Sequence, residues 1–344
     1  MSNPPTNIQP ETGDTHLHPP GWLPRLTPVL HLTRITTAFA AVSNVWFVVL
    51  WTRAVDYERV EATAALREGP LWLLLTGATA MAVGLFAFGT ALNDAIDVRR
   101  DRQLNPARPL AAGRISMEIA LAWTIGALMV ALLGSAALGL PAVIMCLATA
   151  AAILAYNAAL RFVPSIGLVL LGMIYGSHMM AANCFLVFVW PVLLAMTHAL
   201  LAGAITHRLR RARPRLDIRV MVTAGIAYVF WAGVLVFVGH DRSGQLWPDF
   251  VPLTAIAWVM PLALAFVALA IFKTLRAADR RIAAEKVQRY AALWLSIYAT
   301  VWMLATDHHA EALMLAVLTA VGFLGMTILR EVFSLAEHPV GYRR

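Results

Sequence analysis

The sequence predicts an all-α fold, a polytopic bundle of nine or ten transmembrane helices. Hydrophobic residues make up 60% of the chain and charged residues only 13%, and the mean hydropathy is +0.70, so the composition is unlike that of a soluble domain. Apolar segments of about twenty residues, long enough to cross a hydrocarbon core, recur throughout. Because some of them follow each other closely, nine spans fit as well as ten. The ten segments lie near residues 29–51, 71–92, 117–138, 141–160, 165–184, 186–207, 219–238, 252–275, 290–306 and 311–333.

The distribution of basic residues predicts the orientation of the bundle. With the loop after residue 92 in the cytoplasm, all but four of the 27 Lys and Arg residues fall on that side, as the positive-inside rule requires. The same bias explains the net charge of +8, so no nucleic-acid partner is expected. Ten spans place both termini in the cytoplasm. We expect a multi-pass protein of a bacterial cytoplasmic (inner) membrane, in contact with membrane lipids.

A single transmembrane domain is expected over residues 25–335. Residues 1–24 are polar and proline-rich, and they predict a disordered cytoplasmic tail rather than a signal peptide, because no charged region precedes an early apolar core. Residues 336–344 form a short C-terminal tail. In the first span, Arg34 either extends to the headgroups or contacts an anionic diphosphate. Asn44, deeper in that span, is expected to hydrogen-bond a neighbouring helix.

A polar stretch with three aspartates follows the second span. On a helix, Asn93, Asp94, Asp97 and Asp101 are three or four residues apart, so their side chains share one face. Three like charges on one stripe repel each other unless a cation lies among them. Carboxylate oxygens suit Mg²⁺, which completes its coordination with water and phosphate oxygens. A solvated helix end is the alternative, but acidic residues are scarce in this chain, 19 in 344. We therefore predict that these four side chains bind Mg²⁺.

The later spans contain fewer residues that indicate a catalytic or metal-binding site. Small residues such as Gly134 in the third and fourth spans predict close helix packing. Cys146 and Cys184 lie in apolar spans at a spacing that fits neither a disulfide nor a zinc site, so they are expected to be buried. His178, near the middle of the fifth span, is more typical of a hydrogen-bonded structural residue than of a catalytic one. The polar residues 307–311 favour a short hairpin over a metal site.

The acidic stretch resembles the first aspartate-rich motif of the UbiA superfamily of intramembrane prenyltransferases. That motif, NDxxDxxxD at the end of the second transmembrane helix, is matched at every fixed position by Asn93, Asp94, Asp97 and Asp101. The segment 108–113, which reads RPLAAG, also matches the family segment that follows the motif. The all-helical hydropathy is similar to that of the family as well.

The resemblance implies a prenyltransferase that uses Mg²⁺ to ionise an isoprenoid diphosphate and transfers the prenyl group to an acceptor, whose identity the sequence leaves open. Metal and arginines would stabilise the leaving pyrophosphate, and a dry cavity would protect the carbocation from water. Asp94, Asp97 and Tyr156 are the implied catalytic residues, Tyr156 by orienting the donor or by stabilising a cation with its ring. The implied diphosphate contacts are Arg34, Asn93, Arg102, Arg108, Arg161 and Arg208.

Two departures from the family pattern matter. The family carries a second aspartate-rich motif at the end of the sixth helix, but residues 204–211 read AITHRLRR and include no carboxylate. After the fourth helix, Tyr156 is followed at +4 by Leu160 rather than by the usual lysine, and the nearest cation is Arg161 at +5. Either the arginines in 204–211 neutralise the diphosphate in place of a second metal, or the site binds a phosphorylated lipid without cleaving it.

Two alternative functions therefore stand beside a prenyltransferase. One is an intramembrane terpene cyclase, in which a double bond of the substrate is the nucleophile. The other is a non-catalytic lipid-phosphate carrier or pathway scaffold, which the missing second motif favours. His178, His198 and His207 are candidate general bases for an acceptor, each without an assigned partner. A secondary transporter fits less well, because two matching halves with interrupted helices are not apparent.

Overall fold

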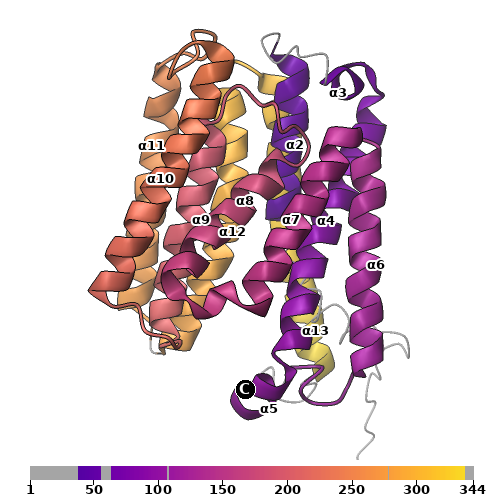
Figure 1. The fold of residues 1–344 in the computed structure, drawn as a ribbon, viewed down its shortest axis with the longest axis vertical. Helices are drawn as coiled ribbons and strands as arrows, with labels where there is room; N and C mark the ends of the chain where they lie inside the picture. The colour runs from indigo at the N-terminus through magenta and orange to yellow at the C-terminus, as the bar shows by residue number, and fades with distance from the viewer. Residues whose placement is uncertain (1–37, 56–62, 107, 278, 338–344) are drawn as a thin grey trace, which may run out of the picture.

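The computed structural model describes residues 38–55, 63–106, 108–277 and 279–337, with side chains up to Leu329. Within these ranges every regular element is helical (Figure 1), which confirms the predicted all-α class. Short helices α3 (Ala64–Glu68) and α5 (Val98–Leu104) and the 3-10 turn η4 (Leu160–Phe162) lie in connections. The helices that match the ten predicted segments are α2 (Phe39–Ala54), α4 (Leu71–Ile96), α6 (Met117–Ala136), α7 (Leu140–Ala158), α8 (Pro164–Met180), α9 (Trp190–Leu209), α10 (Ile218–Ser243), α11 (Thr254–Leu275), α12 (Arg280–Leu304) and α13 (His309–Glu337).

Seven helices in the described part of the chain are long and apolar enough to cross a membrane, namely α4, α6, α7, α9, α10, α11 and α13. The apolar helices α2 and α8 are shorter, and α12 begins with a charged turn. The chain is thus a polytopic helical membrane protein, while the count of nine or ten spans stays a prediction. Both Arg34 and the tail 1–24 lie outside the described residues, as does most of the tail 336–344.

The closely spaced pair of predicted spans forms two separate helices. α7 ends at Ala158 and the turn η4 follows. Pro164 then occupies the first turn of α8, where its missing N–H breaks no helical hydrogen bond. Gly167 lets α8 lie close to this turn, because a Cβ there would come within 3.0 Å of the Cα of Arg161. The connection therefore packs Arg161 closely against the first turns of α8.

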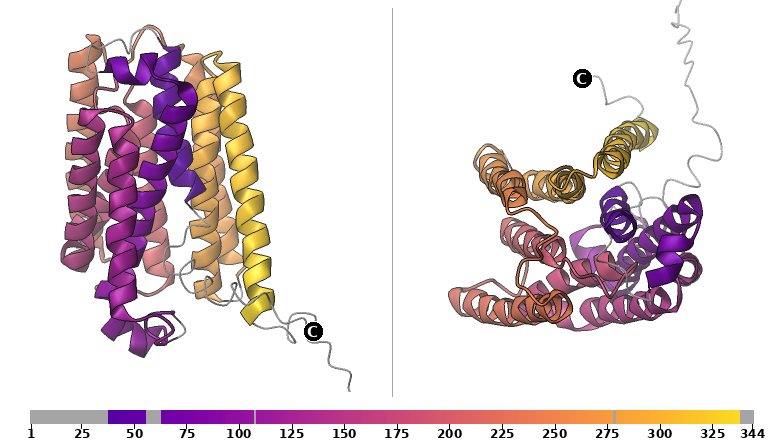
Figure 2. Two further views of the ribbon diagram at one scale, coloured as in Figure 1. Left: turned by 90° about the vertical axis from the view of Figure 1, so that its right-hand side faces the viewer. Right: turned by 90° about the horizontal axis from the view of Figure 1, so that it is seen from above.

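Six helices form an inner ring. Each of α2, α4, α7, α8, α9 and α12 contacts the next, and α12 closes the ring onto α2. The remaining long helices pack outside it: α6 against α4, α10 against α8, α11 against α12, and α13 against both α2 and α12. The view from above in Figure 2 shows α13 beside α12 at the edge of the bundle.

Small residues allow α4 and α6 to pack closely, as predicted for the third span. A Cβ added to Gly84 of α4 would lie 2.6 Å from the backbone nitrogen of Ala131 on α6, and one added to Gly77 would lie 2.8 Å from the carbonyl oxygen of Gly134. Such contacts between helix backbones are typical of membrane helices, whose association depends on close packing. This contact anchors the helix that carries the acidic stretch.

Aromatic rings fill the bundle at the end opposite to α5. The Trp51 ring stacks on Phe188 at a centroid distance of 5.1 Å, and the rings of Trp302 and Trp247 meet Phe188 edge-on at 5.2 and 5.6 Å. Trp51 and Phe188 are almost fully buried. Offset and edge-on ring pairs of this kind stabilise a core beyond their buried area. The inner ring is therefore closed at this end.

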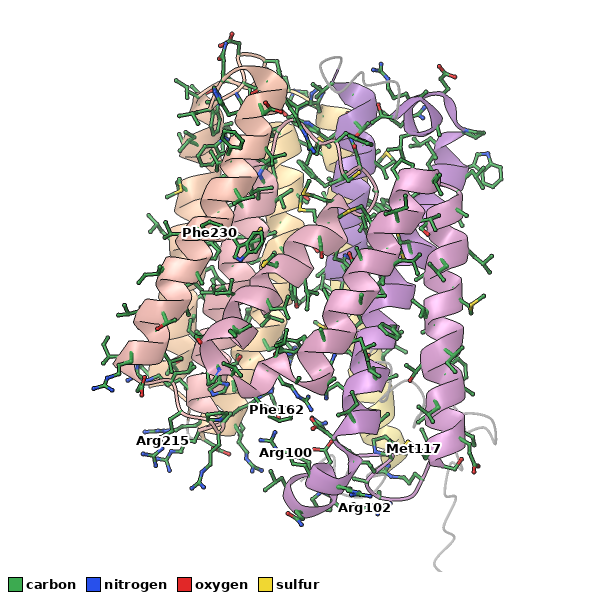
Figure 3. All side chains as sticks on the ribbon, in the orientation of Figure 1. Arg100, Arg102, Met117, Phe162, Arg215 and Phe230 are labelled. Carbon is green, nitrogen blue, oxygen red and sulfur yellow. The ribbon has the colours of Figure 1, made fainter. Side chains whose placement is uncertain are left out.

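The outside of the bundle is apolar, as lipid contact requires. On α10, Ile226, Phe230 and Phe237 are 67%, 63% and 68% exposed, and Figure 3 shows Phe230 on this helix. A soluble monomer rarely exposes so large an apolar surface. The exposed faces therefore agree with a helical bundle surrounded by lipid.

Candidate active site

The acidic stretch spans the junction of α4 and α5. Helical hydrogen bonds continue across it, since the Asp97 N–H donates to the Asn93 carbonyl at 3.0 Å and the Asp101 N–H donates to the Asp97 carbonyl at 2.8 Å. The predicted common face of the four polar side chains is therefore preserved. Asp94 and Asp101 are only 3% and 4% exposed. Buried carboxylates are unfavourable unless they are paired, so their partners matter.

Arg108 pairs with both of the buried aspartates. Its Nη1 lies 2.9 Å from Asp94 Oδ1 and 2.6 Å from Asp101 Oδ2. Asn105 Nδ2 also donates to Asp101, at 3.1 Å. The loop that carries Arg108 is held by a small apolar cluster in which Leu110 packs with residues of α4 and α6. This loop therefore covers one side of the acidic stretch with a cation.

Arg161 pairs with the other two polar side chains of the motif. Its Nη1 donates to Asn93 Oδ1, and its Nη2 forms an ion pair with Asp97. The Arg161 side chain is only 12% exposed, and its buried Nε has no hydrogen-bond partner among the described residues. More than sixty residues separate Arg161 from the motif, so a tertiary contact between η4 and the end of α4 creates this pair.

The donor chemistry fits Mg²⁺ only in part. Within the described residues, no group of three or more His, Cys, Asp or Glu side chains is placed to hold a metal ion. Asp94, Asp97 and Asp101 supply hard oxygen atoms, but each of them lies against a guanidinium group. Magnesium commonly takes one or two carboxylates and completes its shell with phosphate and water oxygens. The residues thus fit a metal that binds together with a phosphate group.

The other predicted site residues lie apart from this cluster. Arg102 is exposed on α5 and Arg208 is exposed at the end of α9, and neither side chain has a hydrogen bond or an ion pair within the described ranges. Figure 3 shows Arg102, together with Arg100 and Arg215, at the same end of the molecule. Tyr156 is half-buried on α7 and packs against the main apolar core.

The three histidines considered as general bases bind backbone carbonyl groups. His198 Nε2 lies 3.0 Å from the Ala291 oxygen and His178 Nε2 lies 3.3 Å from the Ala82 oxygen. His207 Nε2 similarly lies 2.8 Å from the Pro214 oxygen. These contacts are those of structural histidines, as expected for His178. Of the polar residues 307–311, Asp307 and His308 lie in the turn between α12 and α13 and the other three begin α13, in agreement with the predicted hairpin.

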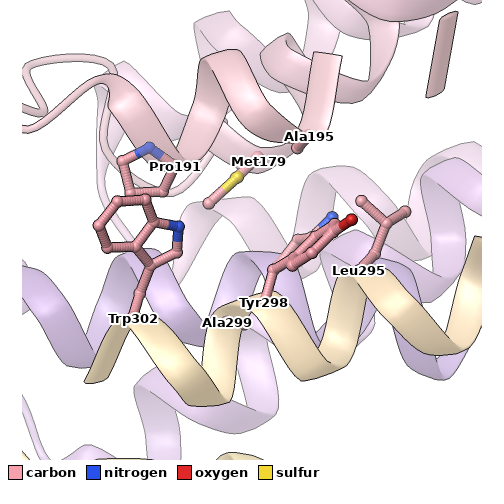
Figure 4. Close-up of a pocket in the computed structure, with 8 residues that line it drawn as sticks. Met179, Pro191, Ala195, Leu295, Tyr298, Ala299 and Trp302 are labelled. Carbon is pink, nitrogen blue, oxygen red and sulfur yellow. The ribbon is translucent and has the colours of Figure 1, made fainter. Parts of the chain in front are cut away.

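A small cavity lies between α2, α8, α9 and α12, away from the acidic stretch (Figure 4). Asn44, Tyr298 and Trp302 supply its polar atoms. Asn44 is 4% exposed and, contrary to the prediction, makes no hydrogen bond to a neighbouring helix in the described structure. The Trp302 Nε1 is likewise buried without a partner among the described residues. Asn44 faces a cavity because small neighbours such as Ala195 leave space beside it, which the sequence does not reveal.

The model of the UbiA prenyltransferase family matches residues 45–297. A structure concerning digeranylgeranylglyceryl phosphate synthase in membranes is 19% identical, covers 82% of this chain and 99% of its own, and gives a TM-score of 0.49. A UbiA homologue from Archaeoglobus fulgidus bound to GPP and Mg²⁺ is 15% identical, covers 87% of this chain and 99% of its own, and gives a TM-score of 0.43. A comparison with curated proteins gave no match.

Proposed function

The chain belongs to the UbiA prenyltransferase family, and from this premise we propose that it is a membrane-embedded prenyltransferase. It ionises an isoprenoid diphosphate with the help of Mg²⁺ and transfers the prenyl group to an acceptor. The observation that carries the proposal is the acidic stretch of α4 and α5, whose four polar side chains share one face and meet two arginines. A site of alternating anions and cations suits a metal–diphosphate pair better than either ion alone.

The residues of this site have distinct proposed roles. Asp94 and Asp97, assisted by Asn93 and Asp101, would hold Mg²⁺, which when bound neutralises charge on the diphosphate. Arg108 and Arg161 donate hydrogen bonds to the phosphate oxygens and stabilise the negative charge that grows as the carbon–oxygen bond breaks. Further proposed contacts are Tyr156 to the donor, and Arg34, Arg102 and Arg208 to the diphosphate.

The membrane setting is part of the proposal. We propose that α2, α8 and α12 also span the bilayer, which gives ten spans in residues 25–335 and places the acidic stretch and both termini on the cytoplasmic side of a bacterial membrane. A prenyl chain can then enter from lipid while its diphosphate stays at the polar end. The apolar interior of the inner ring excludes water from the carbocation.

Pyrophosphate release tests this function. Farnesyl or geranylgeranyl diphosphate is added to the purified full chain with and without Mg²⁺, and the parent is compared with Asp94→Ala. The matched control is Asp241→Ala, which removes an exposed carboxylate at the end of α10. We expect metal-dependent release in the parent and the control and a loss of at least 100-fold, roughly 3 kcal/mol, in Asp94→Ala.

The same assay separates the alternatives. Tight donor binding without release would contradict the enzyme and favour a lipid-phosphate carrier, the second candidate, which the absence of a carboxylate from residues 204–211 supports. Release accompanied by a cyclic product in the absence of an acceptor would identify a cyclase. Neither result changes the assignment to the family.

A further inference from the structure

The cavity between α2, α8, α9 and α12 is a second place where polar groups meet inside the bundle. It lies beneath the aromatic rings around Phe188 that close the inner ring, since Trp302 belongs to both. It is partly open and contains about 200 Å³ of atom-free space, less than a typical pocket for a whole small molecule. Figure 4 shows Tyr298 and Trp302 on one face of α12. Apolar side chains form the rest of the wall, namely those of Met179, Pro191, Ala195, Leu295 and Ala299.

Two of the polar groups at this cavity have no hydrogen-bond partner in the described part of the chain. Asn44 is only 4% exposed and Trp302 only 5%. The Trp302 Nε1 is a buried donor without an acceptor, and the Asn44 amide can both donate and accept. Buried polar groups in folded proteins nearly always have a partner. Two such groups beside one cavity therefore indicate an occupant that supplies the missing partner.

The third polar group, the Tyr298 hydroxyl, is oriented by His198. The His198 Nε2 lies 3.0 Å from the Ala291 carbonyl oxygen, which can only accept, so Nε2 carries the proton. In the neutral imidazole Nδ1 is then an acceptor, and the Tyr298 hydroxyl, 3.3 Å away, donates to it. The Tyr298 oxygen thus keeps its lone pairs for a donor in the cavity. His198 acts on the cavity through Tyr298 and is a positioning residue.

We propose that the cavity binds a hydroxyl group carried by an otherwise apolar molecule, that is, one end of a membrane-soluble alcohol. A hydroxyl group can accept from the Trp302 Nε1 and donate to the Tyr298 oxygen or the Asn44 amide oxygen. A carbonyl group can only accept. A charged group would lack an opposite charge, because none of the residues that line the cavity is charged. The inference goes beyond prenyl transfer and does not depend on it.

Photolabelling with a simple alcohol tests the site. The probe is octan-1-ol carrying a photoreactive diazirine, added to the full chain in a detergent without hydroxyl groups. The matched control probe is the same diazirine without the hydroxyl group. Mass spectrometry measures the labelling of Met179 and Leu295, which line the cavity. We expect the alcohol to label these residues saturably and to be displaced by unmodified octan-1-ol, while the hydrocarbon probe labels them more weakly.

Two substitutions remove hydrogen-bonding groups from the site. Trp302→Phe removes the Nε1 donor, and Asn44→Leu replaces the amide by an apolar group of similar size. In each we expect the alcohol concentration for half-maximal labelling to rise about three- to tenfold, the effect of one neutral hydrogen bond. Labelling by the hydrocarbon probe should stay the same. Trp231→Phe is the matched control, because Trp231 is 41% exposed on α10, and it should change the half-maximal concentration by less than twofold.

The free energy of unfolding separates a binding site from a structural role. Asn44→Leu should weaken labelling by the alcohol while it keeps or raises the stability of the free protein, because no hydrogen bond of the amide within the described structure is lost. An amide with a structural role would lose both together. Asn44→Leu also keeps the test decisive if Trp302→Phe does not fold.

Three results would overturn the proposal. The first is labelling of Met179 and Leu295 that does not saturate or that is equal for the two probes. The second is labelling by the alcohol in Asn44→Leu and Trp302→Phe that differs no more from the parent than labelling in Trp231→Phe does. The third is a loss of stability in Asn44→Leu, which would assign the cavity to a bound water.

Discussion

At the scale of residues, the ion pairs of Arg108 and Arg161 determine the state of the acidic stretch. Asp94 and Asp101 are nearly inaccessible to solvent, and a buried carboxylate that loses its partner keeps the full penalty of desolvation. The Arg108 side chain is 29% exposed, so water weakens its pairs in part. The ion pairs of Arg108 and Arg161 with the aspartates thus contribute to the stability of the ligand-free protein.

Arg108→Gln should lower the free energy of unfolding. We expect a loss of roughly 2–3 kcal/mol, less than the 3–5 kcal/mol typical of fully buried pairs, because Arg108 is partly hydrated. Thermal or detergent-induced unfolding of the full chain measures the change, with Arg100→Gln as the control expected to stay within about 0.5 kcal/mol. Equal stabilities of Arg108→Gln and Arg100→Gln would mean that Arg108 does not pair with the aspartates in solution.

Asn44→Leu should raise the stability of the protein. The Asn44 amide is buried beside a cavity without a hydrogen bond in the described structure, and leucine has nearly the same volume without the unpaired polar atoms. We expect a gain of about 1–3 kcal/mol in the same unfolding assay. Asn157→Leu is the control, since the equally buried Asn157 amide donates to the Ile153 carbonyl at 2.9 Å. A loss of stability in Asn44→Leu would indicate that a bound water satisfies the amide.

At the scale of helices, the contact of α4 with α6 and the turn after α7 set the geometry of the site. Helical periodicity in the sequence predicted the common face of Asn93, Asp94, Asp97 and Asp101, and the structure keeps it across the α4–α5 junction. The contact of Arg161 with that face was not predictable from local pattern. This contact depends on how η4 packs against the end of α4. The only sign of it in the sequence was that Arg161 follows Tyr156 by five residues, where the family usually has a lysine after four.

Gly84→Ala should loosen the contact of α4 with α6. The new Cβ would lie 2.6 Å from backbone atoms of Ala127 and Ala131, which cannot rotate away as a side chain can. We expect a loss of about 1–3 kcal/mol in the free energy of unfolding. Gly126→Ala on α6 is the control, because nothing lies within 4 Å of its added Cβ, and its higher helix propensity should leave stability equal or up to about 1 kcal/mol higher. An unaffected Gly84→Ala protein would exclude the close approach.

At the scale of the whole molecule, composition and apolar segment length were sufficient to predict a helical membrane bundle. In the part of the chain that the structure describes, each of the ten predicted segments contains a helix, because a long apolar run in a membrane has few alternatives to a helix. The closed ring of α2, α4, α7, α8, α9 and α12 was not predictable, since it depends on contacts between distant segments. The ion pairs of Arg108 and Arg161 with the aspartates were not predictable either, because they too join distant segments.

Cysteine labelling tests the predicted orientation. A membrane-impermeant maleimide should label Asp241→Cys from the outside of intact cells, and should label Arg100→Cys only after the membrane is opened. Both positions are exposed, at the end of α10 and on α5 respectively. The expectation follows from the concentration of basic residues on the side of α5. The reverse pattern of labelling would invert the topology and place the acidic stretch outside the cell.

The most direct measurement of the central claim is a structure of the full chain with Mg²⁺ and farnesyl thiodiphosphate. The account predicts the diphosphate at the junction of α4 and α5, with Asp94 and Asp97 turned to the metal and the guanidinium groups of Arg108 and Arg161 moved from the carboxylates to the phosphate oxygens. An analogue bound elsewhere in the bundle, with Arg108 and Arg161 still paired with the aspartates, would contradict it.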